Sequence, residues 1–157
     1  MTHTAGMRSG MVLALVCAAA CTERHAPQVL LAGVPHDLDD LVRRYPVAAT
    51  ASVRVDEIGR TPGTSVHLVQ LRGGEAPHRH AAHDLAVTVV RGAGLLHVAD
   101  AEQAMRAGDV AIVPRGVIHW YTNAGDVPSV TLAIFSPPLD APDSIPVDDV
   151  DRSGDAR

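Results

Sequence analysis

The stretch GDVAIVPRGVIHWYTN, residues 108–123, combines turn-forming residues with a histidine, His119, that can bind a metal ion or transfer protons. The spacing is Gly108, five residues, Pro114, one residue, Gly116, two residues, His119, three residues, Asn123. Glycine beside aspartate makes a tight turn, and proline and glycine close together turn the chain back as a hairpin. The stretch therefore predicts short strands joined by a turn, with His119 following that turn.

A second histidine-bearing stretch lies upstream, at APHRHAAHD, residues 76–84. Residues i and i+2 of a strand point to the same face, so His78 and His80 would project together. Two imidazoles on one face are suitable nitrogen donors for a first-row metal ion. The stretch is therefore a candidate metal site, although an isolated His-x-His pair is also compatible with a solvated turn.

The pattern around these stretches is typical of an all-β domain. From about residue 52, short runs rich in valine, isoleucine and leucine alternate with glycine, proline and aspartate. The candidate strands are SVRVDEI, TSVHLVQL, LAVTVV, GLLHVA, DVAIVP and PSVTLAIF. Many short strands at regular spacing predict a sandwich or barrel and argue against alternating strands and helices.

Taken together, the two stretches resemble the two conserved motifs of the cupin superfamily. The downstream stretch fills every position of the second motif, and the upstream one supplies the paired histidines of the first, with Gly92 closing it. The resemblance covers about residues 52–136 and implies an antiparallel jelly-roll barrel. It also implies that His78, His80 and His119 converge inside the barrel on a divalent metal ion such as Fe, Zn, Mn or Ni.

The acidic ligand of the first motif has no certain counterpart here. Counting forward from His80 places it at Asp84, whereas counting back from Gly92 places it at Leu85. Strand alternation puts His83 on the face of Leu85 and Asp84 on the other face. We favour Asp84 as the additional ligand, with His83 as the alternative and a bare three-histidine site as a third case.

One aromatic side chain is a candidate for the ligand pocket. Tyr121 shares the strand face of His119, whereas Trp120 lies on the opposite face. Tyr121 is therefore expected to line the pocket near the metal, while Trp120 packs outside.

The composition excludes several functions. The formal net charge is −5 and basic residues form no stripe, which argues against a nucleic-acid partner. All 13 basic residues are arginine, so Schiff-base chemistry and phosphate binding by a P-loop lysine are excluded.

The segments outside the barrel predict an anchored protein. Arg8 is followed by the apolar run MVLALVCAAAC, which is too short to span a bilayer but suits a signal peptide. Residues 1–20 resemble a bacterial lipoprotein signal, with Cys21 as the lipidated residue, and a soluble secreted or periplasmic protein is the alternative. Residues 21–51 are interpreted as a tether with a short helix or irregular arm, and residues 137–157 as an extended acidic tail.

These observations predict a metal-binding cupin of the cell envelope, held to the membrane by a lipid anchor, with a small molecule as its ligand. It would be a metal-dependent enzyme of oxygenase or hydrolytic type, or a non-catalytic protein that binds a small ligand or metal. A third hypothesis is a structural lipoprotein in which the metal braces the barrel. Open sheet edges would also allow a homodimer.

Overall fold

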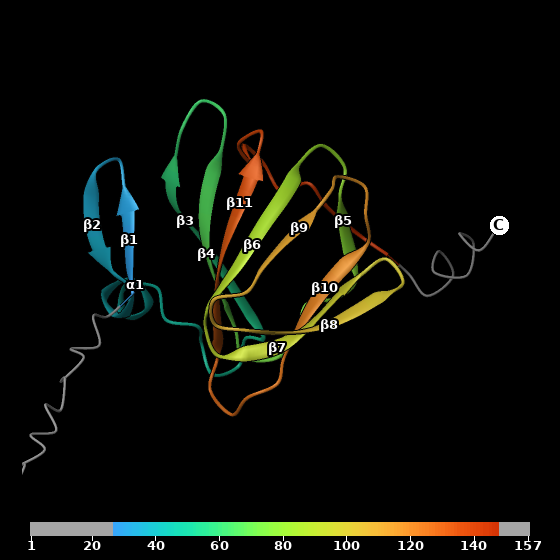
Figure 1. The fold of residues 1–157 in the computed structure, drawn as a ribbon, viewed down its shortest axis with the longest axis horizontal. Helices are drawn as coiled ribbons and strands as arrows, with labels where there is room; N and C mark the ends of the chain where they lie inside the picture. The colour runs from blue at the N-terminus through green and yellow to red at the C-terminus, as the bar shows by residue number, and fades with distance from the viewer. Residues whose placement is uncertain (1–26, 148–157) are drawn as a thin grey trace, which may run out of the picture.

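Two five-stranded antiparallel sheets face each other in a computed structural model of the protein, which describes residues 27–147 (Figure 1). In order, one sheet contains β3 (Val53–Arg60), β4 (Ser65–Leu71), β11 (Ser129–Ser136), β6 (Asp84–Arg91) and β9 (Val110–Val113). The other contains β12 (Ser144–Pro146), β5 (His78–His80), β10 (His119–Asn123), β7 (Ala93–Val98) and β8 (Ala101–Arg106). Strands distant in sequence lie side by side, and the predicted all-β jelly roll is confirmed.

The core lies between the two sheets and consists mainly of aliphatic side chains. In the first sheet, Val69 on β4, Thr131 on β11 and Val89 on β6 stand in register, and all three are buried. Alternating residues on each strand point to the same face, so one face of each sheet supplies the core. The other buried members of this core are Leu71, Leu85, Leu96, Met105, Val113, Tyr121, Ala133 and Phe135.

The N-terminal arm packs against the outer face of the first sheet. It contains β1 (Gln28–Leu31), β2 (Val34–Asp37) and the predicted short helix, α1 (Leu38–Arg44). Asp37 is the N-cap of the helix, and its carboxylate accepts hydrogen bonds from the backbone N–H groups of Asp39 and Asp40. The sequence did not predict the β1–β2 hairpin.

A second apolar cluster fixes this arm to the barrel. It joins Val29, Leu38 and Leu41 of the arm to Leu68 and Val130 of the sheet. The described part of the predicted tether is therefore packed structure.

Two further strands were not expected. β8 lies in a segment that the sequence did not mark as a strand. Five of its six residues are exposed, as suits an edge strand without apolar alternation. β12 lies in the predicted tail and pairs with β5, placing Ser144 opposite His80. The predicted signal peptide, Cys21 and the tail from residue 148 lie outside the described residues. Within residues 27–147, no helix is long and apolar enough to cross a membrane.

Candidate metal centre and ligand cavity

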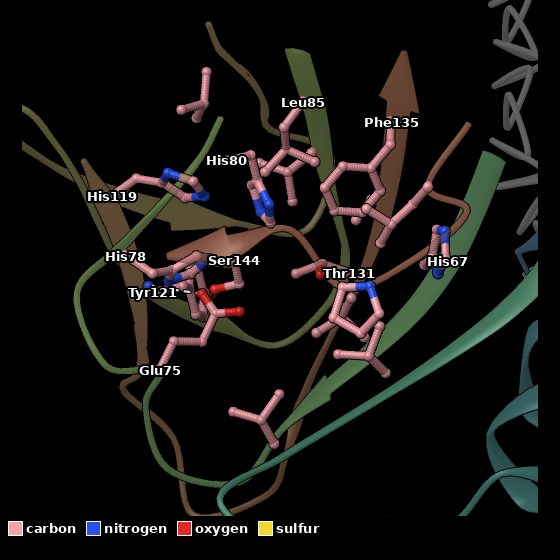
Figure 2. Close-up of a pocket in the computed structure, with 18 of the residues that line it drawn as sticks. His67, Glu75, His78, His80, Leu85, His119, Tyr121, Thr131, Phe135 and Ser144 are labelled. Atoms are coloured by element: carbon pink, nitrogen blue, oxygen red, sulfur yellow. Dashed lines mark hydrogen bonds between the residues drawn. The ribbon is translucent and has the colours of Figure 1, made fainter. Parts of the chain in front are cut away.

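Three histidines meet where β5 and β10 pair. His78 and His80 lie two residues apart on β5, and His119 begins β10 directly opposite His78. One ring nitrogen from each histidine lies within 4.8 Å of those of the other two (Figure 2). The structure therefore brings together the three histidines implied by the motif resemblance.

Each of the three rings is oriented through its Nδ1 atom, which faces an oxygen acceptor. The pairs are His78 with Ala76 O at 2.9 Å, His119 with Val117 O at 3.0 Å, and His80 with the Asp143 carboxylate at 2.7 Å. A carbonyl or carboxylate oxygen can only accept, so a neutral ring carries its proton on Nδ1 and keeps the Nε2 lone pair for a ligand.

The Nε2 atom of His119 makes this cluster a candidate site for a metal ion. It is buried and has no hydrogen-bond partner among residues 27–147. A buried polar atom without a hydrogen-bond partner destabilises the folded protein. A free nitrogen lone pair beside two other imidazoles is suited to binding a divalent transition-metal cation. The donor set fits a divalent transition metal.

Burial favours the neutral form of two of these rings, His119 and His80. Burial lowers the pKa of His119 to about 4, with the neighbouring histidines adding to the effect and the Val117 carbonyl opposing it. Burial also lowers the pKa of His80, although the hydrogen bond that His80 donates to Asp143 acts against it. Metal ligation requires neutral imidazole, so the site is prepared for it at neutral pH.

Asp143 is a functional candidate that the sequence reasoning missed. One carboxylate oxygen is bonded to His80, and the other accepts hydrogen bonds from His83 and from the Ala82 N–H at 3.2 Å. Burial alone would raise its pKa, but the hydrogen bonds from His83 and His80 bring the pKa below the ordinary value. Asp143 acts as an outer carboxylate that orients His80. Its local sequence, APDSIP, carries no signal of this role, because only the pairing of β12 with β5 brings it to the site.

Asp143 also fixes the position of His83. Its Nδ1 faces Asp143 and its Nε2 lies 3.3 Å from the Pro138 carbonyl oxygen. His83 is therefore held by the C-terminal segment, and the structure does not bring it into the three-histidine cluster.

Asp84, which we favoured as the additional ligand, is directed away from the cluster. Its carboxylate accepts hydrogen bonds from Arg115: from Nη2 at 2.6 Å, Nε at 3.1 Å and the backbone N–H at 2.9 Å. These bonds lower the pKa of Asp84 to about 2. Leu85 instead is buried and lines the cavity, as strand alternation requires. In contrast to the ligand set we favoured, the structure brings together the three histidines without Asp84.

The histidines stand in the wall of a cavity of about 730 Å³ between the two sheets. Most of the wall is apolar, with Val69, Leu96 and Phe135 among its residues. Tyr121 also lines the cavity, at the position the sequence indicated, and its buried hydroxyl has no hydrogen-bond partner among residues 27–147. The cavity has the size and character of a site for a small organic molecule.

A second acidic residue missed by the sequence reasoning lies in this wall. Glu75, in the loop before β5, is partly buried and lines the cavity near His78 (Figure 2). Burial raises its pKa, opposed by His78 and by the N–H of Tyr121. The only sequence signal was its position three residues before the His-x-His pair, whereas the expected acid follows that pair.

A barrel of two antiparallel sheets with an internal three-histidine cluster is a jelly roll whose interior could hold a metal ion beside a small-molecule cavity. Residues 65–135 match the family described as the Cupin domain, and the chain belongs to the cupin superfamily.

The chain is similar to three known proteins. An uncharacterized protein of Aquifex aeolicus (strain VF5) is 38% identical over 112 residues, which cover 71% of this chain and 91% of that protein. The structure of KdgF from Halomonas sp. is similar with a TM-score of 0.55 and 24% identity, covering 60% of this chain and 86% of that one. Oxalate oxidase in complex with the substrate analogue glycolate has a TM-score of 0.55 and 21% identity, covering 64% and 57%. At these identities, the two solved structures support the fold alone.

Proposed function

We propose that this cupin binds one divalent transition metal ion through His78, His80 and His119 and uses it to act on a small organic molecule in the cavity. The observation that carries this proposal is the buried Nε2 of His119, which finds no hydrogen-bond partner in the described part of the chain. It lies beside two imidazoles whose Nδ1 atoms are already engaged. Fe, Zn, Mn and Ni all accept imidazole nitrogen.

The chain's own residues suit this role. His78, His80 and His119, from two strands, would hold the ion through three imidazole nitrogens beside the cavity. A metal bound there would supply Lewis acidity or redox chemistry to a coordinated oxygen atom. Asp143 holds His80 in one tautomer, and the apolar walls exclude water from a bound ligand.

An oxygenase-type or hydrolytic activity is the form of chemistry we propose, with non-catalytic binding of a small ligand as the alternative. The alternative is favoured by Asp84, because its pairing with Arg115 removes the expected carboxylate from the centre. Oxygen consumption by the metal-loaded protein, measured across small candidate substrates, distinguishes turnover from binding.

We also propose that the protein is anchored in the cell envelope through a lipid on Cys21. The support is the sequence of residues 8–21, with a basic residue, an apolar run and small residues before the cysteine. Cys21→Ser should release the protein from the membrane fraction of the source cell, and unchanged membrane association would show that Cys21 carries no anchor.

The metal content of protein purified without oxygen tests the central proposal. Wild type should contain close to one equivalent of a transition metal, and His119→Ala should lose most of it. His97→Ala is the matched control, because His97 stacks on Trp120 with ring centroids 4.1 Å apart and is not part of the cluster. Equal metal content in the two variants would contradict the proposal.

A further inference from the structure

Glu75 is fixed in the cavity wall by its neighbour on β10. Its backbone N–H donates to the Tyr121 carbonyl at 3.0 Å, and its Oε2 accepts from the Tyr121 N–H at 3.1 Å. Figure 2 shows its carboxyl group beside His78 and directed into the cavity. The side chain therefore has a defined position next to the three-histidine cluster.

The other acidic residues that line the cavity are already engaged by cationic or imidazole side chains. Glu57 and Asp140 both bind Arg60, and Asp143 binds two histidines. Among residues 27–147, the Glu75 carboxylate accepts one hydrogen bond, from the Tyr121 backbone N–H to Oε2. Glu75 thus keeps an oxygen available to a ligand.

The position of Glu75 also matters because the nearby strand β6 presents no charged side chain to the cavity. Leu85 occupies the inward position at which the first cupin motif would place its acid, and Asp84 is bound to Arg115. A carboxylate accepts hydrogen bonds and donates none when ionised, so it attracts hydroxyl or N–H groups and repels other carboxylates. In a largely apolar cavity, one such group has a large effect on which ligand binds.

We propose that Glu75 determines the ligand specificity of the cavity. It accepts a hydrogen bond from a hydroxyl or N–H group of a molecule held at the three-histidine centre, and it selects against molecules that present only a carboxylate there. The expected ligand class is a small molecule with an apolar body and a proton-donating oxygen or nitrogen. This inference rests on the proposed function, because the metal must hold the ligand beside Glu75.

The test compares two probes on cobalt-loaded protein, whose visible absorption changes when a ligand joins the metal. Acetohydroxamic acid brings an N–H donor beside its metal-binding oxygens, whereas acetate brings acceptors only. Wild type, Glu75→Gln and Glu75→Asp are titrated at about pH 8, with Asp84→Asn as the control that removes a carboxylate outside the cavity. Glutamine keeps an oxygen for the Tyr121 N–H, so the contact that fixes the loop is retained.

Wild type should prefer acetohydroxamic acid, and Glu75→Gln should reduce the ratio of the two affinities by about tenfold or more, as expected when a hydrogen bond to a charged group is lost. Part of the change should be tighter binding of acetate. Glu75→Asp should keep most of the preference, and Asp84→Asn should leave the ratio unchanged.

The possible failures are distinguishable. Stoichiometric cobalt in Glu75→Gln with an unchanged affinity ratio overturns the role of Glu75 and leaves the metal site standing. Loss of cobalt from Glu75→Gln also overturns it, because Glu75 would then support the metal itself. Failure of the wild type to bind cobalt overturns both this inference and the proposed function.

Discussion

Acidification of the metal-free protein should reveal the burial of His119 as a loss of stability. Its pKa is about 4 in the folded state, against 6.5 for an ordinary histidine. Between these values the unfolded chain binds a proton that the folded chain does not, so stability falls as the pH decreases. The contribution of neutral His119 to the free energy of unfolding is fully present above about pH 6.5 and fully lost below about pH 4. A gap of about 2.5 pH units corresponds to about 3 kcal/mol.

Other groups titrate in the same pH range, so the effect of His119 is obtained by comparing the unfolding free energies of the wild type and His119→Gln. Burial lowers the pKa of His80 and His67 and acts in the same direction, whereas the raised pKa of Glu75 acts in the opposite direction. His119→Gln removes one titrating ring and leaves these groups in place. Its unfolding free energy should therefore decrease less than that of the wild type between pH 7 and pH 4, by about 3 kcal/mol.

Urea unfolding of the metal-free proteins, followed by circular dichroism at several pH values, gives both curves. His97→Gln is the control, because His97 lies on the opposite strand face and stacks on Trp120. This control shows the effect of replacing a histidine outside the three-histidine cluster. Parallel curves for wild type and His119→Gln would refute the claim that folding buries a neutral imidazole at this position.

Two further substitutions test the support of the metal site and the packing of the barrel. Asp143→Asn should weaken metal affinity by roughly 10- to 100-fold, as loss of an outer carboxylate typically does, whereas Asp140→Asn should leave the affinity unchanged. Competition with a chelating dye measures both affinities, and equal values in the two variants would contradict the role of Asp143. Gly94→Ala should destabilise the fold by about 1–3 kcal/mol or more, because an added Cβ would overlap the Tyr121 ring and a backbone oxygen of β10. Gly125→Ala, with no neighbour closer than 3.7 Å, is its control in thermal unfolding, and equal destabilisation would refute the packing claim.

Much of the fold could be predicted because it depends on local patterns. The six candidate strands correspond to β3, β4, β6, β7, β9 and β11, whose apolar alternation marks the face that becomes core. β8 escaped detection because an exposed edge strand needs no such alternation. The β1–β2 hairpin and β12 gave no clear signal either, since long-range packing and pairing stabilise them more than local sequence does.

The candidate site was predictable only where spacing decides the geometry. His78 and His80 share a strand face by alternation, and the motif resemblance placed His119 opposite them. Asp84 was favoured from spacing alone, yet its neighbour Arg115 is 31 residues away and holds the carboxylate outside. Asp143 is 63 residues from His80, so no local pattern could connect the two.

X-ray absorption spectroscopy at the edge of the bound metal tests the central claim most directly. Zinc-loaded wild-type protein should show one ion per chain with imidazole scattering from three rings, and His119→Ala should lose one of these rings together with most of its affinity. A metal bound without imidazole scattering, or an unchanged imidazole count in His119→Ala, would contradict a centre built from His78, His80 and His119.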